Sequence, residues 1–192
     1  MILYNSSNTE RVIQFIRDNP GVHLRQIKKE LHVSLGTIQY HLSVLENSGR
    51  IISERLYFRR TYFPVGVFKK NERNILKILK RDNLKAILLF IMEKQNPTQT
   101  DIANGLGLSN STANRLLRYM IDHEIICEIR DRRFKRYHVE DNETIFKLMK
   151  NYHPTLWQSW SQRILGIFLS LWYCATQQYH DALEVLPMIL EV

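Results

Sequence analysis

Apolar residues in the first 50 positions recur at the three- and four-residue spacing of amphipathic helices, in three separate segments. The first ends at Asn19-Pro20-Gly21, and a second, short one covers 24–31. The third begins after Ser34, whose hydroxyl can cap it, and its apolar face is formed by Ile38, Leu42 and Leu45. Because two helices joined by three or four residues form a helix-turn-helix, this order predicts one within 24–47.

Beyond Gly49 the pattern changes to that of β-strands. The runs 51–55 and 61–65 are β-prone and flank the basic pair Arg59-Arg60, which predicts a hairpin of the kind called a wing.

Much of the pattern returns after a shift of 75 residues, with a second hairpin expected from 125–130 and 137–139 around a basic tip at 131–136. The pairs that match at this offset are Ile27 with Ile102, Leu31 with Leu106, Ser34 with Ser109, Thr37 with Thr112, Leu42 with Leu117, and Ile51 with Ile126.

These patterns predict a mainly α fold with small β-hairpin wings, made of two tandem winged helix-turn-helix domains plus a C-terminal helical extension. We expect the first domain at 1–68, a helical linker at 69–83 and the second domain at 84–140. The remaining residues, 141–192, are expected to form helices at 142–152 and 156–179.

Charge points to an acidic partner. The 192 residues include 27 Lys and Arg against 19 Asp and Glu, a net charge of +8. Residues 1–70 hold 11 basic and 5 acidic groups and 71–140 hold 13 and 9, whereas 141–192 hold 3 and 5. This balance indicates nucleic acid or an anionic membrane surface.

Cys127 and Cys174 are the only cysteines, and no Cys/His cluster has zinc spacing. With no secretory leader, this favours a cytoplasmic protein with no metal or cofactor. Both cysteines are interpreted as small buried hydrophobes, with a redox sensor as the alternative.

The stretch 23–52 resembles the winged helix-turn-helix of the MarR and ArsR type, particularly the tandem-domain regulators common in archaea. The resemblance covers about 1–140, and the second copy, 98–126, matches more loosely, with Leu116 where His41 stands and Glu124 where Gly49 stands. The residues that carry it in the first copy are Ile27, Leu31, Val33, Ser34, Thr37, Ile38, His41, Leu42, Gly49 and Ile51.

The resemblance implies that the third helix of each domain enters the DNA major groove. Helical geometry then assigns base readout to Leu35, Gly36, Thr37, Gln39 and Tyr40 in the first domain, and to Asn110, Ser111, Asn114 and Arg115 in the second. Backbone contacts are expected from Ser34, Ser43, Arg118 and the wing residues Arg55, Arg59, Arg60, Arg130, Arg132, Arg133, Lys135 and Arg136. His41 is interpreted as a packed or phosphate-contacting residue rather than a metal ligand.

The C-terminal region is aromatic and poor in charge, since only Arg163 interrupts 156–180. Its longest apolar run, 164–175, is shorter than the roughly 20 residues that a membrane-spanning helix needs. We therefore expect a homodimer interface, with a lid over a ligand pocket, a membrane-surface anchor and burial within the monomer as alternatives. The residues assigned to this interface are Trp157, Trp160, Ile164, Phe168, Leu171 and Trp172.

Together these features predict a cytoplasmic, homodimeric transcription regulator that binds double-stranded DNA sequence-specifically, with basic wings on the backbone or minor groove. The alternative is an RNA-binding or protein-bridging winged-helix module of the transcription machinery, and the second domain in particular can have lost DNA contact. An enzyme is not expected, because the chain has no Gly-rich phosphate loop, paired zinc motif or nucleophile constellation.

Overall fold

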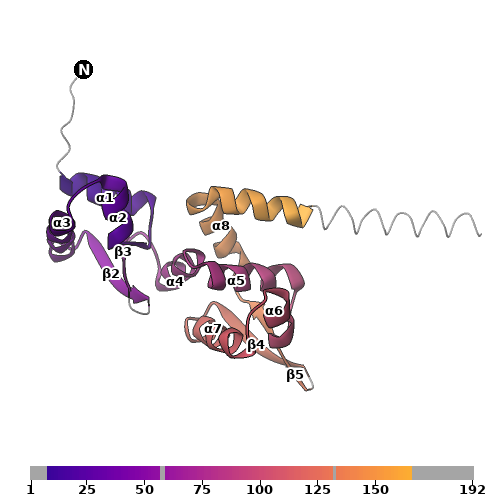
Figure 1. The fold of residues 1–192 in the computed structure, drawn as a ribbon. Helices are drawn as coiled ribbons and strands as arrows, with labels where there is room; N and C mark the ends of the chain where they lie inside the picture. The colour runs from indigo at the N-terminus through magenta and orange to yellow at the C-terminus, as the bar shows by residue number, and fades with distance from the viewer. Residues whose placement is uncertain (1–7, 57–58, 132, 166–192) are drawn as a thin grey trace, which may run out of the picture. The chain divides into compact units, whose positions relative to one another are not determined.

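A computed structural model describes residues 8–56, 59–131 and 133–165. These residues form mostly helices, with two small antiparallel sheets (Figure 1). The mainly α fold with β-hairpin wings is therefore confirmed. The chain divides into two compact units, 1–152 and 153–192.

The first unit begins with three helices, α1 (Asn8–Asp18), α2 (Leu24–Leu31) and α3 (Leu35–Asn47). Their apolar faces meet in one core, where a fully buried aliphatic side chain contributes roughly 1.5–3 kcal/mol. This packing sets the position of α3 relative to α2. The core is built from Val12, Ile13, Ile16, Val22, Ile27, Ile38, Leu42, Leu45, Ile51 and Tyr62.

A tight turn joins α2 to α3. The helix α2 ends at His32, which adopts a left-handed conformation with φ of 53° and donates its N–H to the carbonyl of Lys28. Two residues later Ser34 caps α3, because its Oγ accepts a hydrogen bond from the N–H of Thr37 at 3.2 Å. The predicted helix-turn-helix is confirmed.

The first wing is part of a three-stranded sheet of order β1-β3-β2, made of β1 (Val22–His23), β2 (Ile51–Leu56) and β3 (Arg59–Pro64). The sequence pattern misses β1, because two residues are too few to show alternation. It also places Arg59 and Arg60 outside the strands, which is wrong. Both residues lie in β3, where Arg59 pairs with Leu56 and Arg60 with Arg55.

Helix α4 (Lys70–Leu79) lies within the region expected to be a helical linker, and ion pairs join it to the first wing. The carboxylate of Glu54, on β2, lies 2.6 Å from Nε of Arg73 and 2.5 Å from Nζ of Lys77. The side chain of Lys77 is only 5% exposed, so its ammonium depends on Glu54 for an anionic partner. Burial by itself raises the pKa of Glu54, but the two cations outweigh it and lower that pKa.

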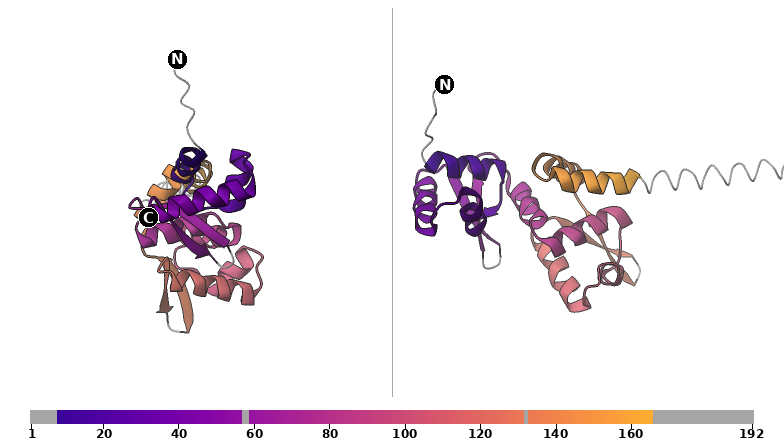
Figure 2. Two further views of the ribbon diagram at one scale, coloured as in Figure 1. Left: turned by 90° about the vertical axis from the view of Figure 1, so that its left-hand side faces the viewer. Right: turned by 45° about the horizontal axis from the view of Figure 1, so that its top comes forward.

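The second domain repeats the same order of elements. Figures 1 and 2 show its hairpin projecting beyond the helices that carry it. The predicted tip at 131–136 is too wide, because the strands continue to Asp131 and resume at Phe134. The elements are α5 (Asp82–Lys94), α6 (Gln99–Gly105), α7 (Asn110–Asp122), β4 (Ile126–Asp131), β5 (Phe134–Val139) and α8 (Asn142–Tyr152).

The offset of 75 residues holds for the backbone in detail. Left-handed residues recur as Gly21 and Asn96, His32 and Gly107, and Gly49 and Glu124. Both hairpins keep one register, since Ile51 pairs with Pro64 and Ile126 with Val139. The bridge between Thr98 and Arg136 likewise reproduces the pairing of His23 with Thr61. The two domains therefore share one backbone plan.

The second unit is described only as far as residue 165, over a helix at 154–165. Within it the rings of Trp157 and Trp160 lie 5.9 Å apart, and Trp160 is buried. Phe168, Leu171, Trp172 and Cys174, and the helix expected up to 179, lie outside the described residues.

Candidate nucleic-acid interface

Helix α3 separates a buried face from an exposed face along its whole length. Ile38, Leu42 and Leu45 are at most 2% exposed, which fixes the rotation of the helix about its axis. Thr37 is half-buried, with its hydroxyl 2.7 Å from that of Ser34. The exposed face carries the other residues expected to contact bases, which are Leu35, Gly36, Gln39 and Tyr40. It also carries Ser43, which is expected to contact the DNA backbone.

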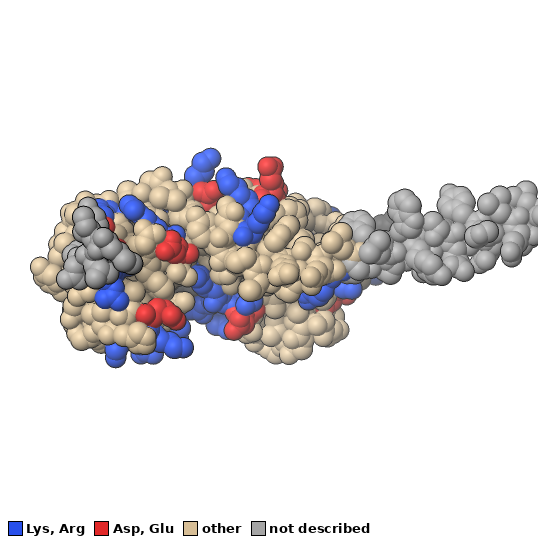
Figure 3. Space-filling view, turned by 90° about the horizontal axis from the view of Figure 1, so that it is seen from above, with Lys and Arg blue, Asp and Glu red and all other residues tan. Residues whose placement is uncertain are grey.

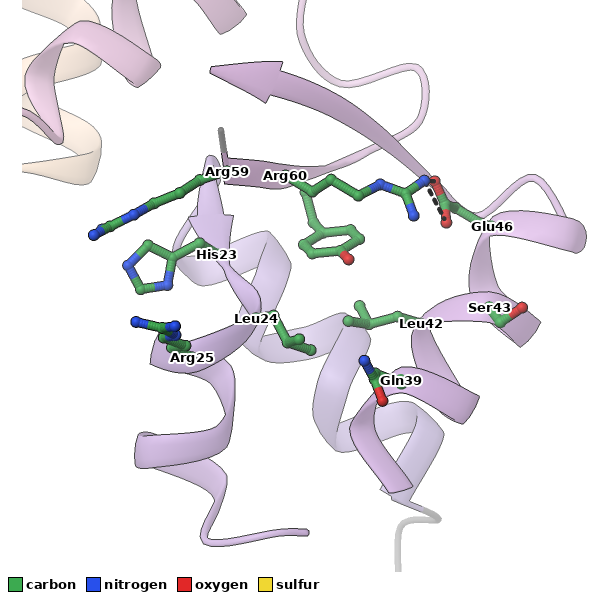
Figure 4. Close-up of a pocket in the computed structure, with 10 residues that line it drawn as sticks. His23, Leu24, Arg25, Gln39, Leu42, Ser43, Glu46, Arg59 and Arg60 are labelled. Atoms are coloured by element: carbon green, nitrogen blue, oxygen red, sulfur yellow. Dashed lines mark hydrogen bonds and ion pairs between the residues drawn. The ribbon is translucent and has the colours of Figure 1, made fainter. Parts of the chain in front are cut away.

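A groove of about 800 Å³ lies beside this face, between α3, the start of α2 and the first wing. In Figure 4, Arg25, His23 and Arg59 lie at one end of it, and Arg60 points across to Glu46. Gln39, Leu42 and Ser43 contribute the α3 wall. The expected reader Gln39 therefore shares one cavity with cations from two other elements.

Arg25 and Arg59 are the available cations of this groove. Both are exposed, and neither forms an ion pair with another residue of the described chain. His23 lies near them and caps α2, where its Nδ1 accepts a hydrogen bond from the N–H of Gln26 at 3.1 Å. Because Nδ1 accepts, Nε2 carries the ring hydrogen and can donate. These groups are suited to an anion such as phosphate.

The sequence interpretation missed Arg25 and His23. A usable signal was present, because basic and donor groups in the first turn of a helix are placed beside backbone N–H groups that already favour anions. What the sequence does not show is that the short strand β1 brings this turn against the wing.

Arg60 has a partner within the protein. Its guanidinium lies 3.1 Å from Oε1 of Glu46 and donates to Oγ of Ser53 at 2.7 Å, while Ser53 also donates to Glu46. Arg60 can therefore reach a phosphate only by leaving Glu46. The carboxylate also places negative charge in the groove that contains Gln39.

Helix α7 presents a comparable exposed face in the second domain. Ser109 caps it by accepting from the N–H of Thr112 at 3.2 Å. The expected contacts Asn110, Ser111, Asn114, Arg115 and Arg118 are all exposed, and Ala113, Leu116, Leu117 and Met120 are buried.

Two basic residues of the second wing, Lys135 and Arg136, are already paired with carboxylates. Lys135 pairs with Glu128 at 2.9 Å, and Arg136 pairs with Asp131 at 2.9 Å. Arg130 and Arg133 are exposed and form no ion pair within the described residues, as is also true of Arg55 on the first wing. Arg132 lies outside the described residues. On the face seen in Figure 3, basic and acidic side chains are interspersed.

The two remaining candidate residues, His41 and Cys127, both contact partners within the protein. His41 is half-buried, with Nδ1 2.8 Å from Oγ1 of Thr9, and its ring packs edge-on against Tyr40. Sγ of Cys127 lies 2.7 Å from Nε2 of His138, its partner across the hairpin. Burial, with a smaller contribution from Glu140, raises the pKa of Cys127 to about 11, which opposes a reactive thiolate.

Within 8–56, 59–131 and 133–165, no three His, Cys, Asp or Glu residues are grouped closely enough to hold a metal ion. Over the same ranges, no helix has the length and apolar character needed to cross a membrane.

Two known domain families match the chain in succession. Residues 6–76 match an N-terminal HTH domain, and residues 82–126 match the IclR helix-turn-helix domain. The chain is a tandem helix-turn-helix protein. Neither matched domain is a catalytic domain, in agreement with the expectation that the chain is not an enzyme. The naming of MarR and ArsR as relatives is approximate, since the second domain of this tandem helix-turn-helix protein matches the IclR type.

Among curated proteins, the chain is 28% identical over 149 residues to the uncharacterized HTH-type transcriptional regulator MJ1398 of Methanocaldococcus jannaschii. The match covers 78% of the chain but only 37% of the length of that relative.

Solved structures with some likeness include three bacterial regulators. ZitR of Lactococcus lactis in complex with DNA is 13% identical, covering 81% of this chain and 92% of ZitR, with a TM-score of 0.33. MepR of Staphylococcus aureus is 17% identical over 63% and 90% of the two chains, with a TM-score of 0.32. FabT of Streptococcus pneumoniae in complex with DNA is 22% identical over 62% and 78%, with a TM-score of 0.31. TM-scores this low carry no weight for the function of this chain.

Proposed function

We propose that this chain is a sequence-specific regulator of transcription that binds double-stranded DNA, with α3 in the major groove and the first wing on the backbone. The observation that carries the proposal is the groove beside α3, where Gln39 shares one cavity with Arg25 and Arg59. Specific DNA binding needs two components, a side chain that contacts base edges and cations that contact phosphates. This surface offers both, because Arg25 and Arg59 have no ion-pair partner among the described residues.

The geometry of α3 suits the major groove. The groove is about 12 Å wide and admits one helix, and the exposed face of α3 is free of acidic residues from Leu35 to Ser43. Gln39 can pair with both polar groups of an adenine edge, and Tyr40, 66% exposed, can contact a thymine methyl group or a phosphate.

The second domain contacts the duplex by other residues. The positions that correspond to Arg25 and Arg59 are Thr100 and Phe134, so the cations of the first groove are not repeated. In their place α7 offers Asn114, Arg115 and Arg118 on its exposed face. The second wing adds Arg130 and Arg133, with Arg132 assigned from sequence alone.

We propose that the protein is a homodimer in the cytoplasm. The dimer forms through the aromatic C-terminal region, whose described part is the helix at 154–165. A two-fold dimer presents each recognition helix twice, so that one short palindromic site is read by both subunits. The division into domains at 1–68, 84–140 and 141–192, joined by a linker at 69–83, belongs to the same proposal.

Fluorescence anisotropy with labelled duplexes tests the proposal. Selection from a random duplex pool first identifies the preferred site, and affinities are then measured over a range of salt concentrations. Gln39→Ala is expected to reduce discrimination at one base pair by about 1–3 kcal/mol, because one bidentate contact is lost. Arg59→Ala is expected to weaken binding to every duplex and to lower the log–log salt slope by about 0.9.

The matched control is Arg17→Ala, which removes the same charge from an exposed position on α1. Its salt slope should equal that of the unchanged protein. If single-stranded RNA competes as well as the selected duplex, or if no duplex binds at low salt, the proposal is wrong and the RNA-binding or protein-bridging alternative takes its place.

A further inference from the structure

A second polar cavity, of about 600 Å³, lies where the N-terminal turn of α5 meets α7 and the first wing. Four of the residues that line it are cations: Arg59, Lys80, Arg81 and Arg115. They come from β3, from the junction of α4 and α5, and from α7. The tertiary structure therefore gathers positive charge that is dispersed along the sequence.

Two of these cations, Lys80 and Arg115, have no carboxylate partner in the described part of the chain. Asp82 also lines the cavity, but its side chain is 94% exposed and pairs with Lys85 at 2.8 Å. Lys80 and Arg115 form no ion pair with any residue that the structure describes. Burial lowers the pKa of Lys80, which means that its ammonium has lost water without gaining an anionic partner.

Helix α5 adds a further attraction for anions. Its 13 residues begin after Arg81, which stands at the N-cap position and has a side chain with donors only. The first-turn N–H groups of α5 therefore find no acceptor on the N-cap side chain to which they could donate. The partial positive charge of the helix N-terminus adds to that of the four cations.

We propose that this cavity binds a phosphate group, held by Lys80 and Arg115. Given the function proposed above, on which this identification rests, the group is a phosphodiester of the DNA backbone beside α7. A free phosphate or a phosphorylated small molecule offers the same chemistry from another source, and the two sources are distinguished below.

Apart from Arg59, the cations of this cavity have no charged counterparts at the matching positions of the first domain. At the offset of 75, Lys80, Arg81 and Arg115 correspond to Asn5, Ser6 and Tyr40, none of which is charged. The proposal reassigns Arg115 from a base edge to the backbone and leaves Asn114 as the reader on α7. It also gives the second domain an anchor in place of the groove cations that it lacks.

The test uses the full chain and the variant Lys80→Met, which removes the charge and keeps an apolar stem. We expect affinity for a duplex at low salt to fall roughly tenfold, the loss of one charge-assisted contact, and the salt slope to fall by about 0.9. We expect thermal stability to rise, because a poorly solvated charge is gone. Arg115→Gln should weaken binding in the same way without that rise. The control is Lys147→Met, the same change at an exposed position of α8.

Isothermal titration with inorganic phosphate, in a buffer free of phosphate, forms the second arm. If Lys80→Met lowers only duplex affinity, the occupant is the DNA backbone. If it abolishes phosphate binding and leaves duplex binding unchanged, the occupant is a free phosphate. The cavity proposal is overturned if Lys80→Met and Lys147→Met behave alike in both arms, whereas the proposed function survives that result. If the unchanged protein binds no duplex, the proposed function is wrong. The titration with inorganic phosphate then decides by itself whether the cavity binds a phosphate group.

Discussion

Replacing Glu54 by Gln tests the ion pairs that fix the first wing to α4. Gln has the shape of Glu but no charge, so the variant leaves the buried ammonium of Lys77 without an anion. Removing one partner of a buried pair costs roughly 3–5 kcal/mol. Because Glu54 is 22% exposed and the amide oxygen still accepts a hydrogen bond, we expect about 2–3 kcal/mol here.

For a unit of 152 residues, this loss lowers Tm by about 4–12 °C, which circular dichroism measures directly. The control is Lys77→Met, which leaves Glu54 paired with Arg73 at 2.6 Å and should change stability by less than about 1 kcal/mol. Equal losses from the two variants would refute the reasoning, because they would show that Lys77 does not depend on Glu54.

The pH dependence of the same pair follows from the lowered pKa of Glu54. A carboxyl group with a pKa below its ordinary value of 4.5 adds stability that is fully present above that pH and is lost as the pH falls through the folded-state pKa. The stability difference between the unchanged protein and Glu54→Gln should therefore narrow in acid.

Three further changes test the interface itself. Gly36→Ala should not lower stability, because an added Cβ meets no atom within 4 Å. It should weaken duplex binding if the backbone of α3 approaches the bases. Unchanged affinity would show that Gly36 lies outside the contact with DNA. Glu46→Gln should release Arg60, strengthen binding to all duplexes and steepen the salt slope by about 0.9, and weaker binding would contradict this assignment. Cys127 should react with iodoacetamide at pH 7.5 far more slowly than free cysteine, because its pKa is about 11, and rapid labelling would reopen a redox role.

Much of the backbone is predictable from the sequence because it depends on local rules. Helix-capping residues such as Ser34 and Ser109, with apolar residues at helical spacing after them, set the starts of α3 and α7. The hairpin ends are less predictable, because arginines such as Arg59 carry no strand signal of their own. Their place in β3 follows from pairing with β2, a contact between segments rather than a property of either.

The interface is predictable only in part, for the same reason. The outward face of α3 follows from its buried face, so Gln39 and Tyr40 can be assigned from spacing alone. Whether each cation is paired with a carboxylate cannot be assigned from spacing, because the partner can lie far along the chain. Arg60 finds Glu46, whereas Arg59 finds no carboxylate among the described residues. Sequence spacing identifies both as basic and cannot tell them apart.

The two domains share a backbone and differ in charge, and this difference determines how each can hold DNA. The left-handed positions and hairpin registers recur at one offset even where Glu124 replaces Gly49, although a side chain at positive φ costs roughly 1–2 kcal/mol. The shared backbone geometry is therefore kept despite a local energetic cost. The cations proposed to contact phosphate in the groove and the cavity, in contrast, differ in position between the two copies. Groove cations occupy positions 25 and 59 in the first copy, and cavity cations occupy 80 and 115 in the second. If both domains engage one duplex, loss of Arg25 and loss of Lys80 should each lower the salt slope, and their effects should add, because these two residues line no common cavity.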